Sequence, residues 1–134
     1  LNEAMVQDYD GLLRIAPAWP AMWDGVATIF AQAQTKIDVQ VQSGNVVFAI
    51  VEAGASGALN VRNPWPAQST IVVDGGSRAT VVAATSADTF ALPAVAGHWY
   101  AILPASSNGA LPNLHVTGTP AATAKTFGPV SIGL

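Results

Sequence analysis

The sequence predicts an all-β fold, an antiparallel β-sandwich with a short N-terminal helix remnant and an extended C-terminal tail. Three observations lead to this prediction. Short apolar runs follow one another from residue 12 to residue 103, tight-turn sequences separate them, and no crossover helix lies between them. The chain of 134 residues fits a single core, because domains cluster near roughly 100 to 150 residues.

The sequence divides into three parts. Residues 1–10 are expected to be a helix remnant from an upstream helical domain, because Leu1, Ala4 and Met5 can share one face while so short a segment cannot hold a helix alone. Residues 11–104 are expected to form the β-sandwich domain. Residues 105–134 are expected to form a C-terminal tail that packs on the sandwich through its apolar residues. Those apolar residues are Leu111, Leu114, Val116, Phe127, Val130 and Ile132.

Nine segments have the length and composition of strands. The clearest is Lys36–Gln42, where every second residue is apolar, so that one face points inward. Val46–Ala53 is almost continuously apolar, which predicts a central strand covered on both faces. Ser43–Asn45 is expected to join these two strands as a hairpin. The other predicted strands are Leu12–Ile15, Val26–Ala31, Ala58–Arg62, Thr70–Asp74, Ala79–Ala84, Thr89–Leu92 and Trp99–Leu103.

The charge composition argues against several classes of function. With five basic residues and a net charge of −3, the chain lacks the excess of lysine and arginine that binds the phosphates of nucleic acid, so no nucleic-acid partner is expected. No apolar run approaches the roughly 20 residues that span a bilayer, so no membrane partner is expected. The absence of cysteine removes disulfides and thiolate metal sites. Because only 10% of the residues are charged, against about 25% on average, we expect part of the surface to be covered by another domain.

No constellation of residues predicts catalysis or metal binding. Glycoside hydrolysis needs two carboxyl groups about 5 to 9.5 Å apart, and the acids of this chain do not form such a pair. Most lie at turn positions, where a side chain caps the local backbone. The acids considered are Asp10, Asp24, Asp38, Glu52, Asp74 and Asp88. His98 and His115 stand alone and are interpreted as structural, so that no catalytic residue, metal or cofactor is expected.

Tryptophan is the one residue type here that could bind a ligand directly, because an exposed ring can stack on a sugar face. The alternative is that rings beside prolines fill corners of the core or of a domain interface. We favour the second interpretation, because ligand-binding tryptophans more often lie in polar loops. Trp19, Trp23 and Trp65 are therefore expected to be enclosed, or to lie on a face that another domain covers, and they remain the candidate carbohydrate-binding residues.

Three segments carry a resemblance to a known family. They are residues 2–11 (NEAMVQDYDG), 12–25 (LLRIAPAWPAMWDG) and 59–66 (LNVRNPWP). The first is similar to a helix end of the Glu-x-Met-Leu-x-Gln-Ser-His type, the second to a Leu-Leu-Pro-Ala-Leu-Pro-x-x-Trp-x-x-Gly segment, and the third to an Arg-x-Pro-Trp corner. In this order they resemble the C-terminal β domain of family 95 glycoside hydrolases, the α-L-fucosidase family.

The resemblance implies a secreted, extracellular parent enzyme with an upstream (α/α)6 catalytic barrel, and a non-catalytic accessory domain in this chain. The family's catalytic carboxylates correspond to no residue here, so the chain alone is expected not to hydrolyse glycosides. Residues 28–38 (TIFAQAQTKID) depart from the family's Gly-Leu-x-Ala-Arg-Gly-Gly stretch, which leaves α-L-fucosidase, α-L-galactosidase and a diverged protein without activity open as the parent. The alternative function is an independent carbohydrate-binding module that uses an exposed tryptophan.

Overall fold

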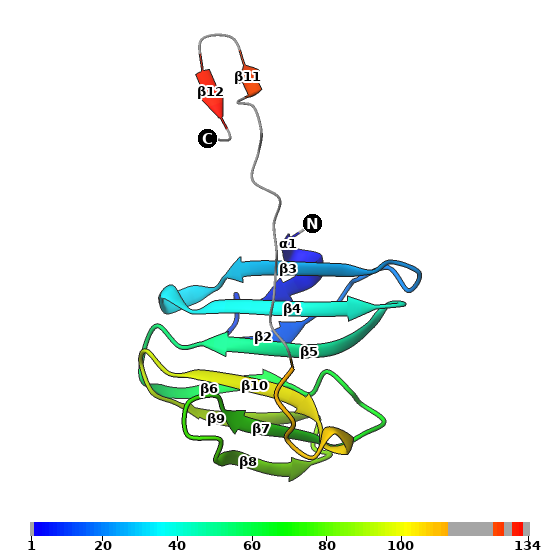
Figure 1. The fold of residues 1–134 in the computed structure, drawn as a ribbon, viewed down its shortest axis with the longest axis vertical. Coiled ribbons are helices and arrows are strands. Elements are labelled where there is room, and N and C mark those ends of the chain that lie inside the picture. The colour runs from blue at the N-terminus through cyan, green and yellow to red at the C-terminus, as the bar shows by residue number, and fades with distance from the viewer. Residues whose placement is uncertain (1, 113–124, 128–129, 133–134) are drawn as a thin grey trace.

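A computed structural model describes residues 2–112, 125–127 and 130–132, and it confirms the predicted all-β sandwich (Figure 1). The smaller sheet contains, in spatial order, β1 (Val6–Gln7), β2 (Leu12–Ile15), β6 (Gly57–Arg62) and β9 (Thr89–Ala94). The larger sheet contains β3 (Gly25–Phe30), β4 (Lys36–Gln42), β5 (Asn45–Glu52), β10 (Trp99–Pro104), β7 (Thr70–Asp74) and β8 (Thr80–Thr85). The remaining elements are α1 (Asn2–Met5), the 3₁₀ turns η1 (Gln32–Gln34) and η2 (Ala105–Ser107), and a hairpin of β11 (Lys125–Phe127) and β12 (Val130–Ile132).

The strand order mixes local hairpins with long-range pairs. β4 and β5 form the predicted hairpin, and Ser43 and Gly44 at its turn both have positive φ, as the twist of a two-residue hairpin requires. β10 lies between β5 and β7, so that Tyr100 is paired with a residue of each. β2 and β6 pair in parallel, whereas the other described pairs are antiparallel. The chain crosses from β5 in the larger sheet to β6 in the smaller sheet. After this crossing β6 runs in the same direction as β2, so that the two strands pair in parallel.

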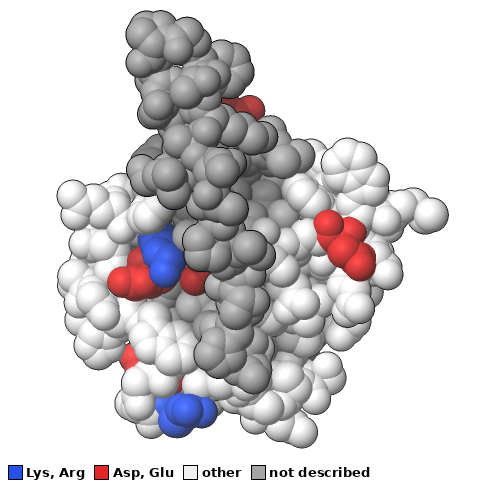
Figure 2. Space-filling model, turned by 45° about the horizontal axis from the view of Figure 1, so that its top comes forward, with Lys and Arg blue, Asp and Glu red and all other residues white. Residues whose placement is uncertain are grey.

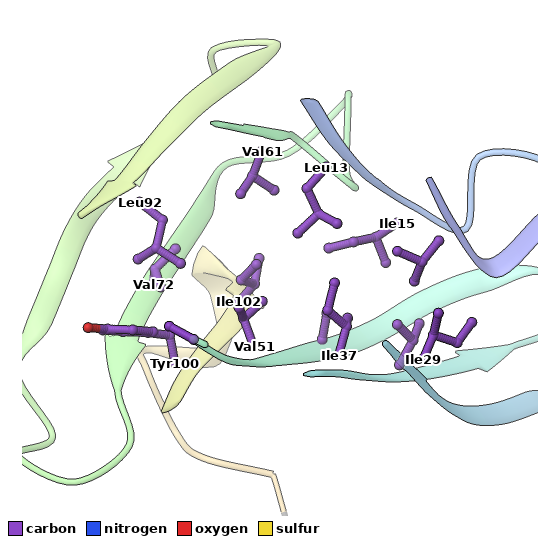
Figure 3. Packing of buried hydrophobic residues seen from close by; sticks show 14 of the residues in the cluster. Leu13, Ile15, Ile29, Ile37, Val51, Val61, Val72, Leu92, Tyr100 and Ile102 are labelled. Carbon is purple, nitrogen blue, oxygen red and sulfur yellow. The ribbon is translucent and has the colours of Figure 1, made fainter. Parts of the chain in front are cut away.

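The core lies between the two sheets. In Figure 3, Leu13 and Val61 of the smaller sheet point toward Ile37 and Ile102 of the larger sheet. The alternation predicted for Lys36–Gln42 is confirmed, since its apolar residues are buried and its polar residues are not. Each fully buried aliphatic side chain contributes about 1.5 to 3 kcal/mol relative to an exposed one. The alternation therefore fixes which face of each sheet is inside.

The β5 strand is apolar on both faces, as predicted. Beside its contribution to the main core, Phe48 and Ile50 join Ala101 and Leu103 of β10 in a second buried cluster on the outer face of the larger sheet. Leu111 packs against this cluster, as the tail prediction requires of it. Leu114 and Val116, and the side chains of Phe127, Val130 and Ile132, lie outside the described residues.

The structure corrects several predicted boundaries. α1 ends at Met5, and Val6–Gln7 pairs with Arg14–Ile15 as β1, because Met5 and Val6 enter the core and tie this segment to the smaller sheet. The prediction of a helix remnant over residues 1–10 is therefore wrong after Met5. β9 continues two residues beyond its predicted end and includes Pro93, which is tolerated because β9 is an edge strand.

Candidate functional site

Trp19, Trp23 and Trp65 belong to two loops that meet at the turn between β4 and β5. The backbone N–H of Gly44 donates to the Trp23 carbonyl at 3.3 Å. The indole N–H of Trp65 donates to the Val46 carbonyl at 2.8 Å. Two tryptophan–proline segments that are about 40 residues apart in sequence thus meet at one hairpin. We call the end of the sandwich formed by residues 16–24, 43–46 and 63–68 the tryptophan end.

The three rings have different environments. Trp65 is half-buried and packs against the main core. Trp19 is also half-buried, and its ring covers Gly25 so closely that an added Cβ there would come within 2.6 Å of it. Trp23 is 55% exposed and meets Trp19 edge to face, with ring centroids 6.2 Å apart. Trp23 is therefore not enclosed within this chain, and its coverage by another domain stays a prediction.

A groove of roughly 310 Å³ lies beside Trp65. Its walls include Ile15, Pro64 and Pro66, and the amide side chains of Asn45 and Gln68 are its longer polar groups. The described residues that line it carry no charge. An aromatic wall with neutral amides suits an uncharged polar ligand such as a sugar.

Asn63 organises the corner that carries Trp65, and the sequence analysis did not identify it. Its side-chain carbonyl accepts from the Trp65 N–H at 2.9 Å and from the Thr70 hydroxyl at 2.6 Å. Its amide group donates to the carbonyls of Gln68 and Ala87. The side chain is buried, and all its polar atoms have partners. The asparagine before a proline was the available signal, since this residue type often binds the backbone of its own turn.

Trp99, the fourth tryptophan, packs on the turn that follows β7. A Cβ added to Gly75 would come within 2.1 Å of the Trp99 ring, and the Gly75 N–H donates to the Trp99 carbonyl. The ring is half-buried and also joins the outer cluster of the larger sheet. Its position is explained by packing.

The structure confirms the turn interpretation for Asp10 and Asp74, whereas Asp24 caps the backbone of a distant turn. Asp10 accepts from the Leu12 N–H, Asp24 accepts from the Ser43 N–H, and Asp74 accepts from two backbone N–H groups of its own turn. Arg14 also binds both carboxylate oxygens of Asp10, each at 2.7 Å. The carboxylates of Asp10 and Asp74 stabilise local backbone, and that of Asp24 links the loop before β3 to the turn between β4 and β5.

Two acids that are distant in sequence come together on the outer face of the larger sheet. The Lys36 ammonium lies 3.7 Å from the Asp38 carboxylate and 3.6 Å from the Glu52 carboxylate. The ammonium therefore bridges the two carboxylates, and its single positive charge offsets one of their two negative charges. A glycosidase pair would need room for a sugar ring and, in inverting enzymes, a water molecule between its carboxyl groups. Asp38 and Glu52 are thus better explained as an ion-pair network.

His98 pairs with Asp74, a contact that the sequence analysis missed. Its Nδ1 lies 3.0 Å from the Asp74 carboxylate, and its ring is half-exposed while the carboxylate is nearly buried. The pKa of Asp74 is lowered from 3.8 to about 2, first by the His98 hydrogen bond and then by the Ser77 backbone N–H. An orienting carboxylate behind a histidine also occurs in catalytic triads, but no serine hydroxyl contacts the His98 ring in the described part of the chain.

We expect this pair to make the stability of the fold depend on pH. The pKa of Asp74 is lower in the folded state than its ordinary value, so the stabilisation is fully present above about pH 4 and is lost as the pH falls toward about 2. Urea unfolding of the unchanged chain and of Asp74→Asn at about pH 6 and about pH 3 would measure it. At about pH 6 the variant should be less stable than the unchanged chain. Its free energy of unfolding should also fall less than that of the unchanged chain between about pH 6 and about pH 3. Asp88→Asn, which removes an exposed carboxylate, is the matched control, and equal slopes for Asp74→Asn and the unchanged chain would contradict the prediction.

Neither protein-family models nor curated proteins match the chain. The likeness to the fucosidase family therefore depends on the three short segments quoted above. Within residues 2–112, 125–127 and 130–132, no helix is long and apolar enough to cross a membrane. The same residues contain no group of three or more His, Asp or Glu that could hold a metal ion.

Proposed function

We propose that this chain is a non-catalytic accessory β-sandwich domain that packs against a neighbouring domain of the same polypeptide and stabilises it. One observation carries the proposal: large apolar side chains are exposed along the edge strand β3 and the loop before it. Met22 is 90% exposed, Trp23 55% and Phe30 74%, and Val26 is exposed between them. We call these four residues the apolar edge.

The apolar edge lacks the features that protect most edge strands. Natural edge strands usually carry charges or proline, or are short or covered. β3 has six residues, GVATIF, with no charge and no proline. On the face seen in Figure 2, the charged side chains of the described surface are few and gather in small groups with uncharged surface between them. A partner that covers the apolar edge would remove this exposed area from water.

The position of the apolar edge favours a partner joined to the N-terminal side. α1 lies next to β3 (Figure 1), and the Met5 methyl would be 3.3 Å from a Cβ added to Gly25 of that strand. A domain connected through α1 would therefore begin close to β3. The resemblance to α-L-fucosidases supplies the class of that domain, an (α/α)6 barrel of a secreted glycoside hydrolase, and this part of the proposal rests on the resemblance alone.

The docking proposal predicts opposite results in two contexts. Trp23→Ser combined with Phe30→Ser should lower the stability of the isolated chain by less than about 1 kcal/mol per site, because both side chains are exposed. In the complete polypeptide the same change should lower the melting temperature and speed proteolysis between the domains. Val95→Ser is the control, since Val95 is also exposed but lies far along the chain from the apolar edge. Equal behaviour of the double variant and the control in the complete polypeptide would refute docking.

An independent carbohydrate-binding module is the second candidate, because an exposed Trp23 and the uncharged groove beside Trp65 occur at the same end of the sandwich. Retention of the isolated chain on fucosylated and galactosylated glycan columns tests it. If the module binds glycans, Trp23→Ala should abolish retention and leave the melting temperature nearly unchanged. If the unchanged chain passes through such columns without delay, the accessory function is the one that remains.

A further inference from the structure

The edge strands of the two sandwich sheets differ in how they are protected against pairing with another strand. Edge strands are usually short, bulged, charged or interrupted by proline, because the free N–H and C=O groups of a regular edge attract a further strand. β1 has two residues, β9 contains Pro93, and the pairing of β8 with β7 is irregular at two places. β3, the upper edge of the larger sheet in Figure 1, pairs with β4 in unbroken register over six uncharged residues without proline. Among the described strands of the sandwich, it is the edge without such a feature.

The outward backbone groups of β3 belong to Val26, Thr28 and Phe30. The Ala31 N–H donates to the Thr35 carbonyl at 2.8 Å, and these two residues continue the register of β3 with β4. In an antiparallel pair, hydrogen-bonded and non-hydrogen-bonded residues alternate along each strand. Every second residue before Ala31 therefore turns its N–H and C=O toward β4, and the three residues between them turn theirs away from it. In the described part of the chain, β3 pairs with no strand other than β4.

The sequence of β3 is complementary to itself. If two β3 strands run antiparallel with Thr28 opposite Thr28, then Val26 of each copy lies opposite Phe30 of the other copy. All three of these pairs join residues whose backbone groups point outward, so each pair can exchange both of its hydrogen bonds. A β-branched residue opposite an aromatic one, and threonine opposite threonine, are favourable cross-strand pairs. On the other face of the strand Ala27 lies opposite Ile29, so that apolar residues again meet and no charges oppose each other.

We propose that two copies of this chain form a dimer in which β3 pairs with β3, centred on Thr28. The two larger sheets join into one continuous sheet about a twofold axis, and each β3 edge is used up in the contact. Side chains of a strand stand roughly perpendicular to its sheet, so the outer face of Val26 and Phe30 stays available to the neighbouring domain of the proposed function. A contact one strand wide is small for a protein interface, so the dimer should dissociate on dilution.

Sedimentation equilibrium of the 134-residue chain, from about 1 μM to about 1 mM, tests the dimer. The average mass should rise from that of a monomer to that of a dimer and no further. Thr28→Lys places two ammonium groups opposite each other at the axis and should raise the dissociation constant by about fivefold or more. Thr80→Lys, the same change at an exposed position of the other edge strand β8, should leave it unchanged. A monomer at every concentration, growth beyond a dimer, or equal effects of the two variants would overturn the proposal.

Disulfide cross-linking tests the register directly, because the unchanged chain has no cysteine. In the proposed dimer the two copies of a Thr28→Cys variant have their Cα atoms at position 28 about 5.5 Å apart, which permits a disulfide. Val26→Cys is the matched control on the same strand, since its two copies would lie roughly 13 Å apart along the strands.

Oxidised glutathione should therefore cross-link Thr28→Cys and leave Val26→Cys as a monomer, whereas a mixture of Val26→Cys with Phe30→Cys should cross-link. Equal cross-linking of Thr28→Cys and Val26→Cys, or none with Thr28→Cys, would overturn the proposed register. These measurements use the chain alone and docking is measured in the complete polypeptide, so either proposal can fail without the other.

Discussion

Replacing Trp65 by alanine should destabilise the fold by about 3 kcal/mol, the lower end of the range for truncating a large aromatic residue in a core. The ring is half-buried against the main core, and its N–H donates to the Val46 carbonyl, so the variant loses apolar contacts and leaves an acceptor of β5 without this donor. Domains have a total stability of roughly 5 to 15 kcal/mol, so the loss is a large part of it. Chemical denaturation with tryptophan fluorescence and circular dichroism would measure the change.

Trp23→Ala is the matched control for this prediction. Both residues are tryptophans of the tryptophan end, but Trp23 is exposed and makes its aromatic contact only with Trp19 in the described structure. We expect a loss below about 1 kcal/mol, which is the scale of an aromatic pair. If the two variants lost equal stability, the distinction between a structural Trp65 and a free Trp23 would be wrong.

Replacing Asn63 by alanine should lower the free energy of unfolding by about 3 kcal/mol or more. The change leaves the fully buried Thr70 hydroxyl and the Trp65 backbone N–H without their acceptor, and each buried group left unsatisfied costs about 1 to 3 kcal/mol. It also removes the donor that the Gln68 and Ala87 carbonyls share. Thermal and urea unfolding would measure the loss, and faster hydrogen exchange at residues 63–70 would locate it.

Asn60→Ala provides the comparison for Asn63, because it removes the same side chain from an exposed position on the adjacent strand β6. It should change stability by less than about 0.5 kcal/mol. A small effect at Asn63, similar to that at Asn60, would mean that water replaces the lost partners and that the corner is not held by this side chain.

The candidate site was predictable only in part. The prolines beside the tryptophans indicated rigid corners, and Trp19 and Trp65 are indeed half-buried. The exposure of Trp23 was not predictable, because the local sequence of prolines and tryptophans is similar around the half-buried and the exposed rings. Asn63 and the pair of Asp74 and His98 were also missed, since each joins backbone or side chains that are far apart in sequence. Such contacts have no local periodicity to reveal them.

The all-β class, most strand positions and the hairpin of β4 and β5 could be predicted from the residues alone. Those features depend on the two-residue alternation of side chains and on turn residues, which act within a few positions of the chain. Tertiary contacts produce the short β1 in place of helix, the parallel pair of β2 and β6, and the insertion of β10 between β5 and β7. These outcomes depend on burying one apolar face against another, and the free energy of that burial is gained only when distant segments meet.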